Sequence, residues 1–276
     1  MRIILIADSH LAASAPAFVA NWNAAAAFAA RSGAELTIHL GDITLDAING
    51  VEQLEYAREL IDRWPTPMRF LPGNHDIGDC PAGAGLPVDD ALHPDWLAKY
   101  RALFGPDYWT LDCDAWRIIA LDAELLGTGT KFEEEQWRWL TAQLAEKPGS
   151  PVALLLHKPL FDRDPNDPVP HSRYISLEPR LRLLDMFAAV DLRIVVSGHV
   201  HQYRDSVYNG VRHLWMPSSA FYIPDSAQLR IGEKVTGVGV IEFESDACHF
   251  NLVVPEGVQR HNILEYPLFP ERANAP

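Results

Sequence analysis

Short apolar runs alternate with longer amphipathic stretches through the first part of the chain. The apolar runs cover residues 2–7, 35–40 and 68–71 and predict buried strands. Between them, an Ala-rich stretch with Ser14 as its N-cap and a second stretch over residues 51–64 have the pattern of helices. Strands that alternate with helices favour parallel pairing through right-handed crossovers.

The rest of the chain continues this pattern and then changes it. Further helices are predicted over residues 94–104, 132–146 and about 178–189. Further strands are predicted over residues 109–113, 116–121, 151–156 and 192–197. Beyond His201 the strands follow one another without helices, which indicates antiparallel pairing, over residues 203–208, 211–215, 237–244 and 247–254. The pattern predicts an α/β fold with two mixed β-sheets packed as a sandwich and helices on the outer faces, in four layers αββα.

No repeat or linker divides the chain, so we expect a single domain over residues 1–276. Within it, residues 225–276 should provide closing strands and an extended C-terminal tail. Pro267 and Pro270 make the end of that tail unsuitable for a helix, so we expect it to lie over a neighbouring surface. Residues 77–90 are rich in Gly, Pro and Asp and predict a loop.

Composition narrows the class of protein. The chain has 48% apolar and 22% charged residues, as is ordinary for a globular protein, and its formal charge is −14. That charge argues against extended nucleic-acid binding. Three scattered cysteines fit a reducing cytoplasm. No apolar run is long enough to cross a membrane. Because Asp8 belongs to the first of the polar motifs described below and leaves no room for a signal peptide before it, we expect no signal peptide and a cytoplasmic protein.

Polar motifs directly follow five of the predicted strands. They are Asp8-Ser9-His10, Gly41-Asp42, Gly73-Asn74-His75-Asp76, His157 and Gly198-His199-Val200-His201. Strand ends are where an open α/β sheet places its ligand site, so all five motifs should meet at one edge. Carboxylate and amide oxygens with imidazole nitrogens and no thiolate suit two divalent cations that keep positions open for water and substrate.

Each motif taken alone has a simpler interpretation. Asp8 or Asp42 alone could form a turn or cap a helix. A single buried histidine such as His39 is more often a satisfied core residue than a ligand. Because all five motifs occupy the same structural context, the metal-site interpretation is favoured.

In this order the motifs resemble those of the calcineurin-like metallophosphoesterases, whose pattern reads DxH, GD, GNH, a single His and GHxH. The resemblance extends from Asp8 to His201. It implies a β-sandwich flanked by helices and a binuclear centre. One cation would be held by Asp8, His10, Asp42 and His201. The other would be held by Asp42, Asn74, His157 and His199, so that Asp42 bridges the two.

The resemblance also implies the chemistry. Two cations about 3.5–4 Å apart can bridge a water, acidify it to a hydroxide and neutralise charge during in-line attack on phosphorus. Asp42 and His75 are therefore the expected catalytic residues; His75 would face the substrate and serve its leaving oxygen. Asp76 could tune His75. The donor types fit manganese, iron or zinc without selecting one.

The substrate is less sharply defined. The chain lacks the arginine of the GDxxDRG motif and has GNHD where serine/threonine phosphatases have GNHE. It looks closer to small bacterial class III cyclic-nucleotide and glycerophosphodiester phosphodiesterases, which favours a phosphodiester. A phosphomonoesterase and a metal-free interaction scaffold on the same fold are the alternatives.

Substrate contacts are expected from Asn74, His75, His171 and Arg173. His171 and Arg173 lie in an irregular segment after His157, and aromatic residues of segment 214–224 could stack on a base. The partner is then a small phosphoester. Because related small phosphodiesterases often dimerise, the resemblance makes a homodimer plausible.

Overall fold

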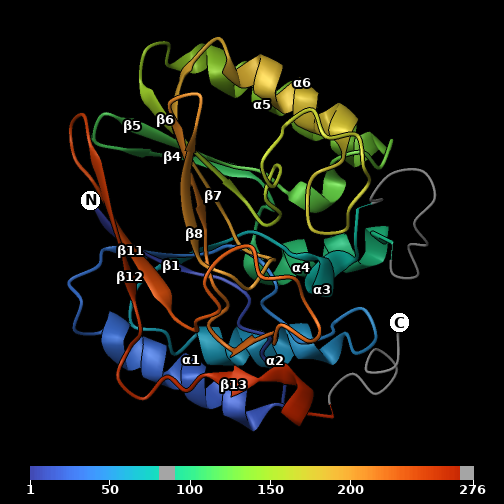
Figure 1. Cartoon of the computed structure of the whole chain (residues 1–276), viewed down its shortest axis with the longest axis vertical. Helices are drawn as coiled ribbons and strands as arrows, with labels where there is room; N and C mark the ends of the chain where they lie inside the picture. Colours follow the sequence, from blue (N-terminus) through green and yellow to red (C-terminus); the bar gives the residue numbers. More distant parts are fainter. Residues whose placement is uncertain (81–90, 268–276) are drawn as a thin grey trace.

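The computed structural model describes residues 1–80 and 91–267 and contains two mixed β-sheets that pack face to face between layers of helices (Figure 1). The first sheet has the spatial order β12 (Cys248–Val253), β11 (Val238–Phe243), β1 (Arg2–Ile6), β2 (Leu36–His39) and β3 (Met68–Phe70). The second has the order β4 (Trp109–Cys113), β5 (Trp116–Ala120), β6 (Pro151–Leu156), β7 (Asp191–Ser197), β9 (Val211–Trp215) and β8 (Arg204–Tyr208). A short parallel pair joins β10 (Phe221–Tyr222) to β13 (His261–Asn262).

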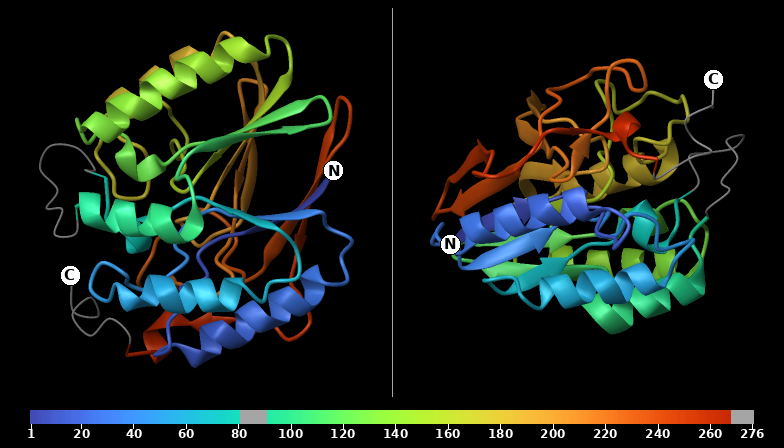
Figure 2. Two further views of the ribbon diagram at one scale, coloured as in Figure 1. Left: turned by 180° about the vertical axis from the view of Figure 1, so that it is seen from behind. Right: turned by 90° about the horizontal axis from the view of Figure 1, so that it is seen from below.

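Helices cover the outer faces of the sandwich. The first sheet is covered by α1 (Pro16–Ala29) and α2 (Glu52–Ile61), and the second by α5 (Lys131–Glu146) and α6 (Leu177–Phe187), as both views of the ribbon show (Figure 2). The remaining helical elements are α3 (Asn74–Ile77), α4 (Pro94–Phe104), η1 (Ala123–Leu125) and η2 (Ile263–Glu265). The predicted four-layer αββα sandwich is therefore confirmed.

Strand β1 shows why its apolar run is continuous. Successive side chains point to opposite faces of a strand. Ile3 and Leu5 enter the core between the two sheets, whereas Ile4 and Ile6 enter the core beneath α1 and α2. All four are at most 1% exposed. A strand buried on both faces needs apolar residues at every position.

Two tryptophans tie the sheets together. The Trp109 indole on β4 donates a hydrogen bond to the Phe70 carbonyl on β3, at 2.7 Å. The Trp116 indole on β5 donates to the carbonyl of Glu244, just beyond β11, also at 2.7 Å. Both bonds run from the second sheet to the first and fix how the sheets face one another.

Parallel pairing then brings the strand ends to one place. Strands β1, β2 and β3 pair in parallel in the first sheet, as do β5, β6, β7 and β9 in the second. Parallel strands end at a common edge, and the packing of the sheets places the two edges side by side (Figure 1). The polar motifs predicted at the strand ends lie along this junction.

Some local predictions were wrong. Helix α1 begins at Pro16, with Ala15 rather than Ser14 at the N-cap position, because proline is well suited to the first helical turn. The antiparallel pairing expected beyond His201 holds for β8 with β9 and for β11 with β12. On its other edge, β9 pairs in parallel with β7, which the pattern did not predict, because the β8–β9 hairpin turns β9 back beside that strand.

The predicted loop and tail also need correction. Part of the loop expected over residues 77–90 is described: Ile77 ends the short helix α3, and residues 81–90 lie outside the described residues. In the tail, β13 and the 3₁₀ turn η2 interrupt the expected extended chain. Tyr266 then packs on Phe18 of α1, so this part does lie on the chain's own surface. Residues 268–276, with Pro270, lie outside the described range.

We predict that Trp116→Phe destabilises the protein by about 2–4 kcal/mol, because it removes a buried hydrogen bond between the sheets and leaves a cavity beside Phe243. Trp139→Phe is the control, since Trp139 is only partly buried against the second sheet. Urea unfolding followed by circular dichroism measures both. Equal stability of the Trp116 variant and the wild type would contradict the role of this bond.

Candidate metal centre

Left-handed backbone conformations gather at the junction of the sheets. Among the described residues, seven non-glycine positions have positive φ, and two of them, Asp114 and Asn209, lie in hairpin turns. The other five are all predicted ligands: Asp8 (52°), His10 (46°), Asp42 (52°), His199 (67°) and His201 (56°). Such conformations cost on the order of 1–3 kcal/mol each and persist only where the surroundings enforce them, typically at functional sites.

Hydrogen bonds between neighbouring loops enforce this backbone. The loops after β1 and β2 pair through Asp8 N–H to the Gly41 carbonyl (3.0 Å) and His10 N–H to the Asp42 carbonyl (3.1 Å). The Ser218 hydroxyl donates to the Asp8 carbonyl at 2.7 Å. These bonds fix the backbone that carries the Asp8, His10 and Asp42 side chains.

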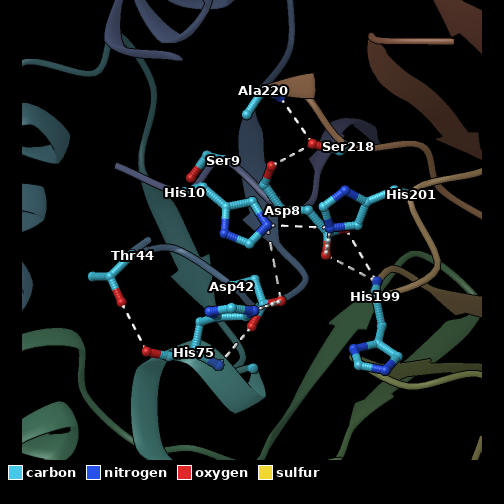
Figure 3. A network of polar contacts seen from close by, with 12 residues as sticks. Asp8, Ser9, His10, Asp42, Thr44, His75, His199, His201, Ser218 and Ala220 are labelled. Atoms are coloured by element: carbon cyan, nitrogen blue, oxygen red, sulfur yellow. Dashed lines mark hydrogen bonds and ion pairs between the residues drawn. The ribbon is translucent and has the colours of Figure 1, made fainter. Parts of the chain in front are cut away.

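The first ligand group consists of Asp8, His10, Asp42 and His201, whose donor atoms all lie within 4.8 Å of one another. The Nε2 atoms of His10 and His201 are 3.1 Å apart, and His201 Nε2 is 3.3 Å from Asp8 Oδ1 (Figure 3). All four side chains are buried. These are the residues predicted from the sequence for one cation.

The second group shares Asp42 with the first and adds His157 and His199. His157 Nε2 lies 3.3 Å from Asp42 Oδ2, and His199 Nδ1 lies 3.2 Å from His157 Nε2. The fourth predicted ligand, Asn74, has a buried Oδ1 with no hydrogen-bond partner among the described residues. An unsatisfied amide oxygen, a shared carboxylate and clustered imidazoles are donors suited to two divalent cations, so the residues present fit a binuclear metal centre.

Bonds to the backbone orient two of the histidines. His157 donates from Nδ1 to the Leu40 carbonyl at 2.8 Å, which turns Nε2 toward Asp42. His199 donates from Nε2 to the Ser172 carbonyl at 3.1 Å, which leaves Nδ1 for the site. Such a bond fixes the tautomer and the ring orientation of a metal-binding histidine.

Electrostatics favour cation binding. Burial would raise the pKa of Asp42, but His157, His75 and His10 lower it well below its ordinary value, so the carboxylate is ionised. Burial lowers the pKa values of His10 and His199 well below the usual range and keeps these rings neutral. Burial would also lower the pKa of His157, but the neighbouring Asp42 carboxylate raises it to about 10. The neutral rings of His10 and His199 are therefore ready to bind a metal ion, whereas His157 would release a proton when a metal ion binds.

His75 lies at the open side of this cluster. Its backbone N–H donates to Asp42 Oδ1 at 2.9 Å, and its Nε2 is 4.0 Å from Asp42 Oδ2 (Figure 3). The His75 side chain is 14% exposed, whereas that of Asp42 is 2% exposed, so His75 can face a substrate.

Asp76 organises the surrounding loops. Its carboxylate accepts hydrogen bonds from the backbone N–H groups of Ile43, Thr44 and Gly73 and from the Thr44 hydroxyl. Four bonds from two loops hold the segment of Asp42 against that of Asn74. Sequence reasoning considered Asp76 only as a partner of His75 and missed this role.

The predicted substrate contacts have different surroundings. His171 and Arg173 flank Ser172, whose carbonyl binds His199, so this segment borders the centre. Both are half-buried and line a cavity of about 180 Å³ that also includes Tyr174. Phe221 is not a free stacking surface for a base, because it is 3% exposed and packs on the rings of His10 and His201.

Two further features could not be found by motif. His39, excluded as a ligand, binds the Ser9 hydroxyl through Nε2 and accepts the Gly41 N–H through Nδ1, and so supports the loops. A third group of donors, Asp79, Cys80 and Glu124, also lies close together, but the ammonium of Lys158 contacts all three. Neither feature has a local sequence signal, because each depends on contacts between distant segments.

Comparisons with known proteins agree with this geometry. The family described as "Calcineurin-like phosphoesterase" matches residues 1–203. The 3',5'-cyclic adenosine monophosphate phosphodiesterase CpdA of Escherichia coli K12 is 27% identical over 261 residues, which cover 89% of this chain and 86% of CpdA. A probable glycerophosphodiester phosphodiesterase, GpdQ of Arcobacter nitrofigilis, is 26% identical over 180 residues, which cover 64% of this chain and 60% of GpdQ.

A solved structure also supports the fold. The crystal structure of a dimetal phosphatase from Danio rerio superimposes on this chain with a TM-score of 0.61 at 15% identity. The superposition covers 91% of this chain and 95% of the phosphatase chain. At that identity the likeness concerns the fold alone. Within the described residues, no helix is long and apolar enough to cross a membrane.

We predict that Gly73→Ala weakens metal binding by at least about 10-fold without a change of fold. The backbone of Gly73 has φ −118°, which alanine tolerates, but a Cβ would lie 2.2 Å from Asp42 Oδ1 and 2.3 Å from its backbone nitrogen. Gly33→Ala is the control: with φ +71° it strains the backbone, but its Cβ meets nothing within 4 Å, so it shows whether strain from a glycine substitution alone weakens metal binding. Titration with Mn²⁺ monitored by calorimetry compares the variants, and unchanged affinity in Gly73→Ala would refute the steric argument.

Proposed function

Because the chain belongs to the calcineurin-like phosphoesterase family, we propose that it is a binuclear metal-dependent phosphohydrolase that prefers phosphodiesters. The substrate we propose is a small cyclic nucleotide or glycerophosphodiester. The observation that carries the proposal is the pair of donor groups that share Asp42, namely Asp8–His10–Asp42–His201 and Asp42–His157–His199. The buried Asn74 Oδ1, which has no hydrogen-bond partner among the described residues, is consistent with it.

Two divalent cations, when bound, supply Lewis-acid activation of water and neutralise the negative charge of the phosphoryl group. We propose manganese, iron or zinc, since the donor types do not separate them. The protein supplies a rigid framework: Asp42 is held by the His75 backbone, and His157 and His199 are held by carbonyl groups. The ligands are thus arranged before the ions arrive, which reduces the cost of binding them.

His75 acts on the substrate in this proposal. It holds a proton on Nε2 and passes it to the oxygen of the departing alcohol as the phosphorus–oxygen bond breaks. Its ring is near Asp42 but partly exposed, as a group that meets a substrate must be. His171 and Arg173, beside Ser172, would contact the alcohol part or a non-bridging oxygen.

The preference for a diester is supported by the names of two relatives, CpdA and GpdQ, both called phosphodiesterases. A phosphomonoesterase is the alternative within the family. A metal-free scaffold is disfavoured, because every predicted ligand position is filled and the donor atoms converge. A homodimer and a cytoplasmic location remain predictions from the sequence.

The proposal is tested by metal content and activity measured together. Protein purified without chelator should bind about two metal equivalents per chain and hydrolyse bis-p-nitrophenyl phosphate faster than p-nitrophenyl phosphate. Asp42→Ala should lose both equivalents and its activity, because Asp42 belongs to both ligand groups. Asp46→Ala is the matched control in the same loop, since Asp46 binds the exposed Asn49 side chain. Absence of metal and of metal-stimulated activity in the wild type would exclude the enzyme.

His75→Ala should separate chemistry from metal binding. We expect both cations to remain bound, because the backbone N–H that orients Asp42 is kept. Turnover of a diester with a poor leaving group should fall by roughly 10²–10⁴-fold, with a smaller loss for a nitrophenyl ester that needs no proton. An equal loss for both esters would favour a purely electrostatic role, and loss of metal would place His75 among the ligands.

A further inference from the structure

Lys158 follows the proposed ligand His157 and is almost completely buried. Its exposed fraction is 1%, and its ammonium forms an ion pair with Asp79. The same nitrogen lies 3.2 Å from Glu124 Oε2 and 3.2 Å from Cys80 Sγ. A fully buried lysine is rare unless its charge is paired, so these contacts account for its presence.

The cluster of Asp79, Cys80, Glu124 and Lys158 connects three separate segments. Lys158 follows β6, Glu124 belongs to η1, and Asp79 and Cys80 follow α3. Glu124 is itself fully buried and also accepts the Cys80 N–H at 3.0 Å. The lysine ammonium thus lies at the point where these three segments meet.

The charge of the Lys158 ammonium is compensated in this buried setting, because it pairs with the carboxylates of Asp79 and Glu124. The donors of Asp79, Cys80 and Glu124 are close enough to hold a metal ion, and the ammonium contacts all of them. The chain therefore supplies its own cation where a third metal ion would otherwise fit.

The segments joined by Lys158 carry ligands of one cation only. His157 precedes Lys158, and Asn74 begins α3, five residues before Asp79. Both are proposed for the second cation. The ligands found only in the first group, Asp8, His10 and His201, lie on loops stabilised by other bonds, among them those from Asp8 to Gly41 and from Ser218 to Asp8.

We propose that Lys158 is a positioning residue that, through Asp79 and Glu124, holds His157 and Asn74 in place for the second cation. The inference rests on the proposed metal centre. Its consequence is an asymmetry: loss of Lys158 weakens one metal site and leaves the other intact. A residue that only stabilised the fold would affect both sites together or neither.

The test is a titration of full-length apoprotein with Mn²⁺ alone, with free Mn²⁺ followed by electron paramagnetic resonance. Lys158→Met should keep one tight equivalent and bind the other about 10–100-fold more weakly, the usual loss when a group behind a metal ligand is removed. His157→Ala provides the reference isotherm for a damaged second site. Lys99→Met, which breaks an exposed ion pair with Glu55, is the matched control and should bind like the wild type.

A double variant separates positioning from stability. Lys158→Met leaves Glu124 buried without its cation, which lowers Tm and could prevent folding. Lys158→Met combined with Glu124→Gln removes both buried charges, so Tm should recover. The link to Asp79 is still missing in this variant, so the second site should stay weak.

The outcomes are distinct. Recovery of second-site affinity together with Tm in the double variant would overturn the proposal, since stability alone would then explain the loss. Wild-type affinity at both sites in Lys158→Met would overturn it as well. A wild-type chain that binds fewer than two equivalents would instead count against the metal centre itself, and would refute this inference along with it.

Discussion

Two hydrogen bonds that cross between the sheets determine the arrangement of the candidate site. His157, at the end of β6, donates to the Leu40 carbonyl in the first sheet, and the His199 backbone N–H donates to the Asp8 carboxylate. Both require very close approach of the loops. A Cβ on Gly41 would lie 2.4 Å from His157 Nδ1, and one on Gly198 would lie 2.8 Å from Asp8 Oδ2. The two glycines thus allow the strand ends of separate sheets to share one set of ligands.

The same junction concentrates backbone strain. Five proposed ligands have left-handed backbone, which aims adjacent side chains such as Asp8 and His10 into a common space. The strain is offset by the hydrogen bonds between the loops after β1 and β2 and by the four bonds to the Asp76 carboxylate. Locally unfavourable backbone conformations that the rest of the fold enforces are expected at functional sites. In this chain they occur in the loops that carry the proposed ligands.

Buried charge is balanced in two different ways on the two sides of His157. Toward the proposed metal centre, clustered carboxylates and imidazoles form groups that could hold divalent cations. Away from it, Glu124 and Asp79 are neutralised by a lysine of the chain itself. A permanent internal cation stabilises a scaffold, whereas an exchangeable one can take part in chemistry. In our proposal, the internal cation supports the binding of the exchangeable one.

The sequence by itself determined the αββα architecture and the placement of the polar motifs at strand ends, because apolar runs mark buried strands and parallel strands end at a common edge. The assignment of Asp8, Asp42, Asn74, His157 and His199 to two cations follows from the resemblance to the family and remains a prediction. Only the tertiary structure decided the parallel pairing of β9 with β7, the burial of Phe221 against His10, and the contacts of Asp76 and Lys158. These depend on segments distant in the chain that meet only after the sheets pack. A local pattern of residues does not predict contacts between segments that are far apart in the chain.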